Sequence, residues 1–312
     1  MAAERSGSTQ LEQWISLGAT IVAPVTVLGA LLFYFGYVSS ASEYACFGIN
    51  VDTIGLSTQD YVMRSPQTLL VPLLVLTLVS AAFLMLNGVV RRRITSVVAS
   101  ASDPARQIAG IRTVVRRSRI PGLAVLGGGV VLLFIYGYIR DWTLYGLVTP
   151  LLIALGSAVI AYAWRLLSML QRLEEQPETA ASDGSALARR TAGVVIYVLI
   201  AASIFWATAT VAQWSGRGLA QYAVAHFDDL PGVILDTKER LFLRDPGIEE
   251  TQLPPSQGQV FHYRYRGLRL LIEGQNRMFL VPGGAWSATD ATLIVPLDGS
   301  VRVQFQFQGQ PP

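Results

Sequence analysis

The sequence is poor in the residues that build reactive centres and water-exposed surfaces. Its 312 residues include one cysteine, Cys46, and two histidines, His226 and His262. One cysteine excludes an intrachain disulfide and a cysteine-based zinc site, and two histidines leave little for a histidine metal site. Charged residues make up only 14% of the chain, whereas a soluble domain usually carries about 25%. This deficit falls in long apolar runs, which indicates an integral membrane protein.

Five apolar runs are each close to the roughly 20 residues needed to cross a hydrocarbon core. They predict transmembrane helices at about 17–38, 68–90, 121–139, 144–167 and 191–214. The first run is longer than a signal-peptide core and follows a polar tail, 1–16, without a basic start, so we expect it to be retained. The interiors of the spans contain no Asp, Glu, Lys or His. This absence argues against an ion-coupled transporter or a proton pump, which keep such groups at mid-membrane.

The arginines predict how the spans are oriented. Segment 91–120 holds eight arginines against one acid, and segment 168–190 holds three arginines. The loops 39–67 and 140–143 hold one arginine each. The positive-inside rule therefore places the amino terminus and both arginine-rich segments in the cytoplasm and the carboxy-terminal region outside. The predicted fold is an α-helical integral protein of the cytoplasmic membrane, with five spans (17–214), N-in and C-out.

Residues 215–312 predict a small extracytoplasmic β-rich domain. A short helix is expected at 218–229, before a Leu-Pro-Gly stop. Period-two alternation of apolar and polar residues along 261–266 and 301–307 favours half-buried antiparallel strands. Strands are predicted at 232–236, 240–244, 259–266, 268–273, 277–281, 291–296 and 300–307, with a hairpin turn at 274–276.

The external loop 39–67 has signals of an ordered structure. Gly48 is a good helix C-cap, and Ser57 with Asp60 matches a capping box at the start of a new helix. The loop is therefore predicted to fold as a hairpin between two membrane helices. Its apolar side chains would face either the membrane surface or the outer domain, and the predicted docking residues are Phe47, Ile49, Ile54, Leu56 and Tyr61.

Segment 91–120 predicts a basic, moderately amphipathic helix with Asp103 as N-cap and Pro104 at its first position. Such a helix beside a membrane most often lies on anionic headgroups, and binding of a specific partner or lipid is the alternative. The expected lipid contacts are Arg91, Arg92, Arg93, Arg106, Arg116 and Arg117. The segment 168–190 is Ala-, Ser- and Gly-rich and is expected to be a flexible connector.

Residues able to carry chemistry are few. His226, Asp228 and Asp229 have the types for an acid–base or metal site, but a solvated helix end is the commoner role for this pattern. Asp236 and Glu239 resemble a charged hairpin turn. Arginines 264, 266 and 269 are expected on a solvated sheet face, with an anionic envelope ligand as the alternative. No phosphate-binding glycine loop, metalloprotease helix or nucleophile elbow is present, so we expect no cofactor, and the Gly127–Gly129 run favours close helix packing.

Two stretches carry a resemblance. The pattern YFGY…FGI…D…GLSTQDYVMRS and the outer segments LDTKERLFLRDPGIEETQLP and FHYRYRGLRLLIEGQNRMFLVPGG resemble uncharacterised actinobacterial multi-span membrane proteins. The resemblance implies the same architecture and no activity, cofactor or catalytic residue.

The expected function is a non-enzymatic envelope scaffold, sensor or accessory subunit whose loop packs on the outer domain. A pore or transport component is the alternative, and an enzyme comes third. The expected partners are the bilayer and other envelope proteins, with no nucleic acid; self-association stays open.

Overall fold

The structure is a computed structural model that describes the chain except for residues 1–2, 101–103, 140–141, 174–182, 285–290 and 307–312. The chain divides into two compact units. The sheet unit comprises Met1–Leu69 and Ala212–Pro312, and the helical unit comprises Leu70–Val211. The sheet unit is therefore built from two parts of the chain that are distant in sequence, whereas the helical unit is one continuous segment.

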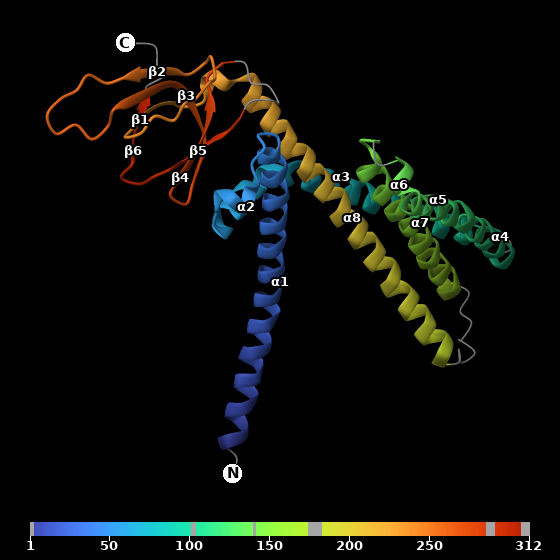
Figure 1. The fold of residues 1–312 in the computed structure, drawn as a ribbon. Helices are drawn as coiled ribbons and strands as arrows, with labels where there is room; N and C mark the ends of the chain where they lie inside the picture. The colour runs from blue at the N-terminus through green and yellow to red at the C-terminus, as the bar shows by residue number, and fades with distance from the viewer. Residues whose placement is uncertain (1–2, 101–103, 140–141, 174–182, 285–290, 307–312) are drawn as a thin grey trace. The chain divides into compact units, whose positions relative to one another are not determined.

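Within the described residues, most of the chain is helical (Figure 1). Five stretches of helix are long and apolar enough to cross a membrane: Pro24–Ala45, Thr58–Ala99, Arg106–Phe134, Tyr145–Gln171 and Arg190–Ala225. The five long apolar helices predicted from the sequence are therefore confirmed. The helices are α1 (Ala3–Ala45), α2 (Val51–Ile54), α3 (Thr58–Ala99), α4 (Pro104–Arg117), α5 (Arg119–Phe134), α6 (Tyr136–Ile139), α7 (Tyr145–Leu173) and α8 (Asp183–Ala225).

Two helix predictions are wrong in detail. The span 121–139 is interrupted, because Ile135 leaves the helical conformation (φ −92°, ψ 9°) between α5 and α6. The separate helix at 218–229 does not form, since α8 continues without a break to Ala225 and a short 3-10 helix, Phe227–Asp229, follows. Gly216 lies inside α8, where a neighbouring backbone comes close.

The carboxy-terminal part of the sheet unit is an antiparallel sheet, as predicted (Figure 1). The strand order is β5-β4-β3-β1-β6, and β2 also pairs with β3. Its buried core includes Val233, Leu235, Tyr265 and Leu280. The described strands are β1 (Gly232–Thr237), β2 (Glu249–Gln252), β3 (Tyr263–Gly274), β4 (Arg277–Pro282), β5 (Leu293–Pro296) and β6 (Val301–Gln306).

The predicted strand at 240–244 is wrong. The backbone N–H of Leu241 donates to the Tyr265 hydroxyl at 2.7 Å instead of joining a strand ladder. Phe242 has a positive φ of 52°, which a regular strand excludes. Strand β2 pairs with β3 and was not predicted, because Glu249 and Glu250 disfavour strands. Opposite charges across the ladder, such as Glu249 facing Arg266, compensate for that composition.

The predicted strands 259–266 and 268–273 form one continuous strand, β3. Gly267 adopts φ +81° within it, a conformation that only glycine adopts without strain. A two-residue turn then joins β3 to β4, with Asn276 at φ 51°. Positive φ at this position is typical of tight hairpins, so the predicted turn at 274–276 is confirmed.

In the helical unit, α5 packs along α7 through small residues. A side-chain carbon added at Gly156 would lie 2.5 Å from the backbone nitrogen of Leu126, and one at Gly129 would lie 2.7 Å from Ile153. Gly127 and Gly128 have nothing within 4 Å. Close packing by the glycine run is therefore confirmed at Gly129 alone. Between α3 and α7, the Tyr162 hydroxyl donates to Asn87 at 3.4 Å.

Candidate functional site

The loop between α1 and α3 is fully structured. Helix α1 ends at Ala45 and a turn leads to Gly48, whose φ of +71° fits the predicted C-cap. The short helix α2 follows, with the Asn50 side chain accepting from the Asp52 N–H at 3.0 Å. Gly55 then reverses the chain at φ +74°. Two glycines in left-handed conformations thus shape the loop, because other residues adopt this conformation only with strain.

The predicted capping box at the start of α3 is confirmed. The backbone N–H of Ser57 donates to Asp60 Oδ2 at 2.8 Å, and the N–H of Asp60 donates to Ser57 Oγ at 3.2 Å. The Ser57 hydroxyl also donates to Asp60 Oδ2 at 2.7 Å. This reciprocal pattern satisfies two helix-start donors and fixes where α3 begins.

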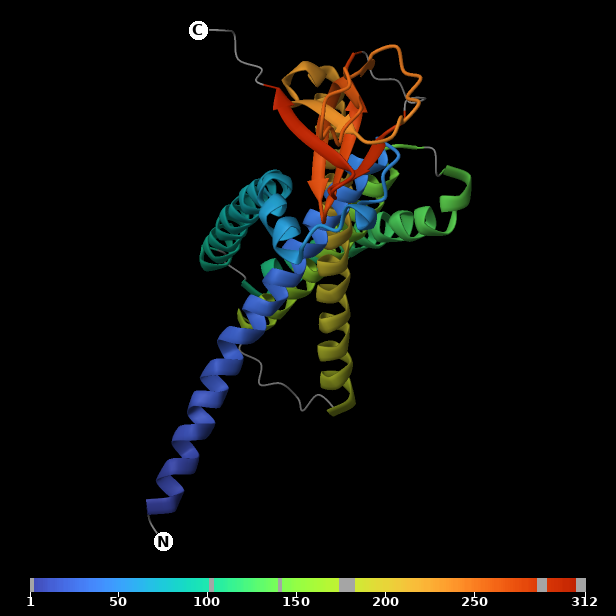
Figure 2. The ribbon, with the colours of Figure 1, turned by 60° about the vertical axis from the view of Figure 1, so that its left-hand side comes forward.

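The loop and the carboxy-terminal domain share one hydrophobic cluster, which we call the junction core. The loop contributes Phe47, Ile49, Val51 and Ile54, and the sheet contributes apolar side chains of β3 and β4. Figures 1 and 2 show α2 and the end of α1, both blue, beside the sheet. The buried members are Tyr44, Phe47, Ile49, Val51, Ile54, Tyr61, Ala220, Phe227, Ile272, Phe279 and Val281.

The backbones of loop and sheet also meet directly. The N–H of Gln275 donates to the carbonyl of Ile54 at 3.2 Å, and the Thr292 hydroxyl donates to the carbonyl of Phe47 at 2.9 Å. A side-chain carbon added at Gly274 would lie 2.0 Å from the Ile54 oxygen. That separation is far below van der Waals contact, so only glycine at position 274 allows α2 to sit on the β3–β4 turn.

Three helix ends converge on the junction core. A side-chain carbon at Gly36 of α1 would lie 1.9 Å from the Tyr61 oxygen of α3, and one at Gly216 of α8 would lie 2.0 Å from the Ser39 oxygen of α1. The Tyr37 and Tyr61 rings meet edge to face at 5.4 Å. Such backbone contacts tie α1, α3 and α8 together where they meet the sheet.

Four of the five predicted docking residues lie in the junction core. Phe47, Ile49, Ile54 and Tyr61 are buried, and Leu56 is half-buried against the cluster. The sequence left two surfaces open for these side chains, the membrane surface and the outer domain. In the structure the side chains face the outer domain. The sheet side of the core, Ile272, Phe279 and Val281, was not singled out from the sequence, because the strands that carry these residues have continuous apolar runs rather than alternation.

Asp236 lies in the middle of the sheet, and the prediction of a charged turn there is wrong. Its carboxylate is fully buried in β1 and accepts from Arg264 at 2.8 and 3.0 Å and from Arg302 Nε at 3.0 Å. The hydrogen bonds from Arg264, and then those from Arg302, hold the pKa of Asp236 below its usual range, although burial opposes them. In return, Asp236 raises the pKa of Arg264. Arg264 is thus part of an ion triad with Asp236 and Arg302.

The predicted lipid-contacting arginines fall into two groups. Arg91, Arg92 and Arg93 are exposed on α3, and Arg106, Arg116 and Arg117 are exposed on α4. The predicted N-cap, Asp103, lies outside the described residues. The apolar side of α4 differs from the expectation: Ile108 and Val115 are buried, and Val115 packs with Ala163 and Leu166 of α7. A second helix, rather than a bilayer surface, covers this face.

The weak candidate site at His226 is open to solvent. His226 Nδ1 lies 2.9 Å from the Tyr222 carbonyl, and its ring stacks on Tyr222 at 4.2 Å. Asp229 is exposed, and the side chain of Asp228 lies outside the described residues. Among the residues that the structure describes, no group of three metal-ligating side chains occurs. His226 therefore follows directly on the end of α8, where its ring contacts Tyr222 of the last helical turn.

The junction core is the contact that brings the predicted docking residues against the sheet. Comparisons with protein families, with curated proteins and with solved structures find no match to this chain. The function is therefore inferred from the geometry of the chain itself.

Proposed function

We propose that this chain is an integral protein of the cytoplasmic membrane that acts without catalysis, as an envelope scaffold, sensor or accessory subunit. Its amino terminus lies in the cytoplasm, and the external loop with the carboxy-terminal domain forms one module outside. The observation that carries the proposal is the junction core, which joins α2 to the sheet. The resemblance to actinobacterial membrane proteins agrees with this architecture.

The module couples the sheet to the membrane helices. The Ile54–Gly274 contact holds the β3–β4 turn on the loop, and Gly36 and Gly216 hold α1 against α3 and α8. A force or ligand acting on the sheet would therefore reach three helix ends through packed backbone, with no slack linker between them. Rigid coupling of this kind suits a scaffold or a sensor, and it needs no reactive side chain.

Cysteine crosslinking tests the module. In a Cys46→Ser background, G55C with Q275C should form a disulfide in intact membranes, because a side-chain carbon at Gly55 lies 3.4 Å from Gln275 Cβ, close to the 3.5–4.5 Å of disulfides. The control pair is G55C with G299C, since Gly299 has nothing within 4 Å. Absence of the crosslink in the first pair, or equal crosslinking in both, would contradict the proposed packing.

A second arm avoids the strain of a cysteine at the positive φ of Gly55. G274A should open the module and expose residues 39–67 to protease in right-side-out vesicles, whereas G299A should leave it closed.

Reporter fusions test the orientation of the chain in the membrane. Alkaline phosphatase fused after Pro312 should be active in whole cells, and β-galactosidase fused there should be inactive. The reverse pattern would overturn the N-in, C-out orientation.

A pore or transport component is the second candidate, supported by a cavity of 840 Å³ among α3, α7 and α8 of the helical unit. Its lining is mainly apolar, with Ser80, Tyr162 and Arg165 among the polar residues. Flux of ions or small solutes through reconstituted protein, abolished by G193W at a glycine that lines the cavity and retained by G127A, would favour this function. Tight vesicles with a folded protein would exclude it for the solutes tested.

A further inference from the structure

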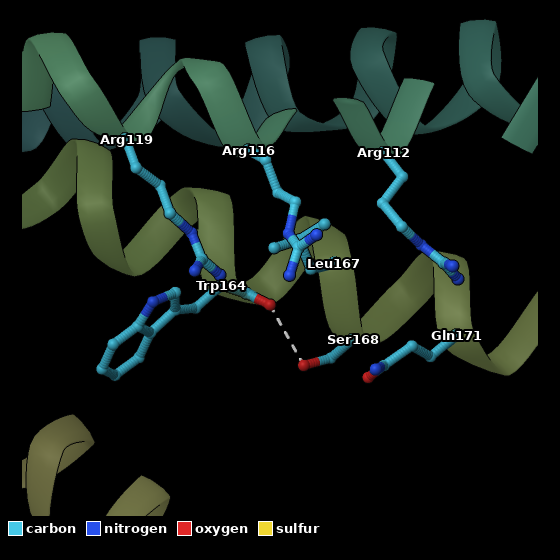
Figure 3. Close-up of a pocket in the computed structure, with 7 residues that line it drawn as sticks. All are labelled: Arg112, Arg116, Arg119, Trp164, Leu167, Ser168 and Gln171. Carbon is cyan, nitrogen blue, oxygen red and sulfur yellow. Dashed lines mark hydrogen bonds between the residues drawn. The ribbon is translucent and has the colours of Figure 1, made fainter. Parts of the chain in front are cut away.

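A second cavity in the helical unit has an unusual lining. It encloses 690 Å³ between the α4–α5 segment and α7, and its seven lining residues include three arginines and no acid (Figure 3). The lining residues are Arg112, Arg116, Arg119, Trp164, Leu167, Ser168 and Gln171. Only Arg116 of these three arginines was among the lipid contacts expected from the sequence.

The cavity is formed by two matching stripes of side chains. The arginines are spaced i, i+4 and i+7, which places them on one side of a helix. Ser118 stays helical (φ −64°, ψ −14°), so the stripe continues from α4 into α5. Trp164, Ser168 and Gln171 have the same spacing on α7, and Figure 3 shows the arginines projecting toward them.

The electrostatics of this cavity favour an anion. Three guanidinium groups on one stripe repel one another, and the repulsion grows where solvent is partly excluded. Arg119 Nε is buried without a hydrogen-bond partner among the described residues, and an unpaired buried donor is unfavourable. A phosphate group would supply acceptors in the planar, two-point geometry that guanidinium groups prefer.

The remaining walls of the cavity identify the kind of phosphate. The Arg119 guanidinium lies 5.9 Å from the ring centre of Trp164, and Leu167 adds an apolar surface. Trp164 stands near one end of an apolar helix, where tryptophan is common at the level of lipid headgroups. Basic pockets between helices on the cytoplasmic side are suited to anionic lipid headgroups.

From these observations we propose that the cavity binds the phosphate of an anionic phospholipid headgroup, with Arg116 and Arg119 on the phosphate and Trp164 beside the glycerol backbone. This site rests on the proposed membrane placement. It differs from general attraction to a charged surface, because it depends on particular arginines and not on the number of charges.

Lipid titration of the full chain in a neutral detergent tests the site. The probes are dihexanoyl-phosphatidylglycerol, dihexanoyl-phosphatidylcholine and inorganic phosphate, with bound species counted by native mass spectrometry. R116Q/R119Q should raise the Kd for phosphatidylglycerol roughly thirtyfold, at about fivefold for each arginine. The matched variant R190Q/R217Q has the same net charge but changes two exposed arginines of α8 that do not line the cavity. It should alter the Kd less than about twofold.

Each outcome decides the proposal. Equal weakening in both double variants would reduce the site to surface charge and overturn it, as would equal binding of phosphatidylcholine. Inorganic phosphate binding as tightly as the lipid would assign the cavity to free phosphate instead. If R116Q/R119Q does not fold, the melting temperature of the parent protein tests the site instead. It should rise with phosphatidylglycerol and stay unchanged with phosphatidylcholine or inorganic phosphate. The G55C–Q275C crosslink in the same samples reports the proposed module independently.

Discussion

The two units differ in how far their large apolar side chains are buried. In the sheet unit the closest contacts lie beside large buried side chains, and Ile54, Tyr265 and Phe279 are each less than 2% exposed. In the helical unit many large apolar side chains of α3 are more than half exposed, such as Leu70, Leu78 and Leu84. Glycines let helix backbones approach in both units, at Gly36 and Gly216 in the sheet unit and between α5 and α7 in the helical unit. The large buried cluster of the junction core lies in the sheet unit.

This difference follows from the solvent that each unit is proposed to meet. Burial of apolar side chains stabilises a fold only where the alternative is water. Between helices in lipid that driving force is absent, and close packing of small residues takes its place. The sheet unit is therefore expected to respond strongly to loss of a buried apolar side chain, and the helical unit to gain of a methyl group at a close contact.

The largest expected effect comes from replacing one phenylalanine of each unit by alanine. Phe47 of the junction core is 3% exposed and Phe134 at the end of α5 is 84% exposed. Phe47→Ala should destabilise the sheet unit by about 3–5 kcal/mol, and Phe134→Ala should change stability by less than about 0.5 kcal/mol. Denaturant unfolding of the full chain in detergent, followed by protease sensitivity of each unit, measures both. Equal losses would refute the comparison.

Asp236 gives the next largest effect. Asp236→Asn leaves Arg264 and Arg302 without their anion. Because these guanidinium groups keep 24% and 47% exposure, we expect a loss of about 2 kcal/mol, below the 3–5 kcal/mol for a fully buried pair. The exposed Glu273→Gln on β3 is the control. Thermal unfolding at neutral pH compares the two variants, and a loss no larger than the control's would contradict the role of the triad.

The same triad predicts a pH dependence. Folding lowers the pKa of Asp236, so the unfolded chain binds a proton at higher pH than the folded chain does. The stabilisation is therefore fully present above the ordinary carboxyl pKa of 3.8 and is lost as pH falls through the lower folded value. The stability difference between the parent protein and Asp236→Asn should shrink below about pH 4. A difference that stays constant between pH 7 and pH 3 would contradict this assignment.

A smaller effect is expected from glycines of the helical unit. Gly156→Ala would bring a methyl group within 2.5 Å of Leu126, and overpacking of this kind typically costs about 1–3 kcal/mol. Gly128→Ala meets open space and should stabilise α5 by up to about 1 kcal/mol. Steric-trap or denaturant unfolding in micelles separates the two. Destabilisation by Gly128→Ala would mean that another surface covers that side of α5.

The sequence predicted most of the fold because its strongest signals are local. Long apolar runs, the Ser57–Asp60 pairing and the turn at 274–276 each depend on residues close together in the chain, and the structure contains all three. The strand at 240–244 failed because a tertiary hydrogen bond from Leu241 to Tyr265 replaces its ladder. Strand β2 was missed because only its partner β3 makes Glu249 and Glu250 favourable there.

The candidate sites depend on contacts between distant parts of the chain. The docking residues of the loop were recognisable as apolar positions in an ordered loop, but their partners on β3 and β4 lie more than 200 residues away. The stripe of Arg112, Arg116 and Arg119 was not singled out from the sequence, because nothing local distinguished Arg119 from Arg117. Only the packing of α4 and α5 on α7 separates an arginine that lines a cavity from one that points to solvent.

The smallest effect compares two substitutions near the ends of one helix. Ser57→Ala removes the cap of α3 in the sheet unit and should cost about 1 kcal/mol, because the Asp60 N–H and carboxylate both lose a partner. Thr95→Ala lies near the other end of α3, where the Thr95 hydroxyl donates to the carbonyls of Arg91 and Arg92 in its own helix. It should stabilise the helical unit by about 0.5 kcal/mol, since alanine has the higher helix propensity. Amide hydrogen exchange of the full chain measures both, with faster exchange confined to the first turns of α3 in Ser57→Ala. Faster exchange along the whole helix would mean that the two units unfold together, and the distinction between them would fail.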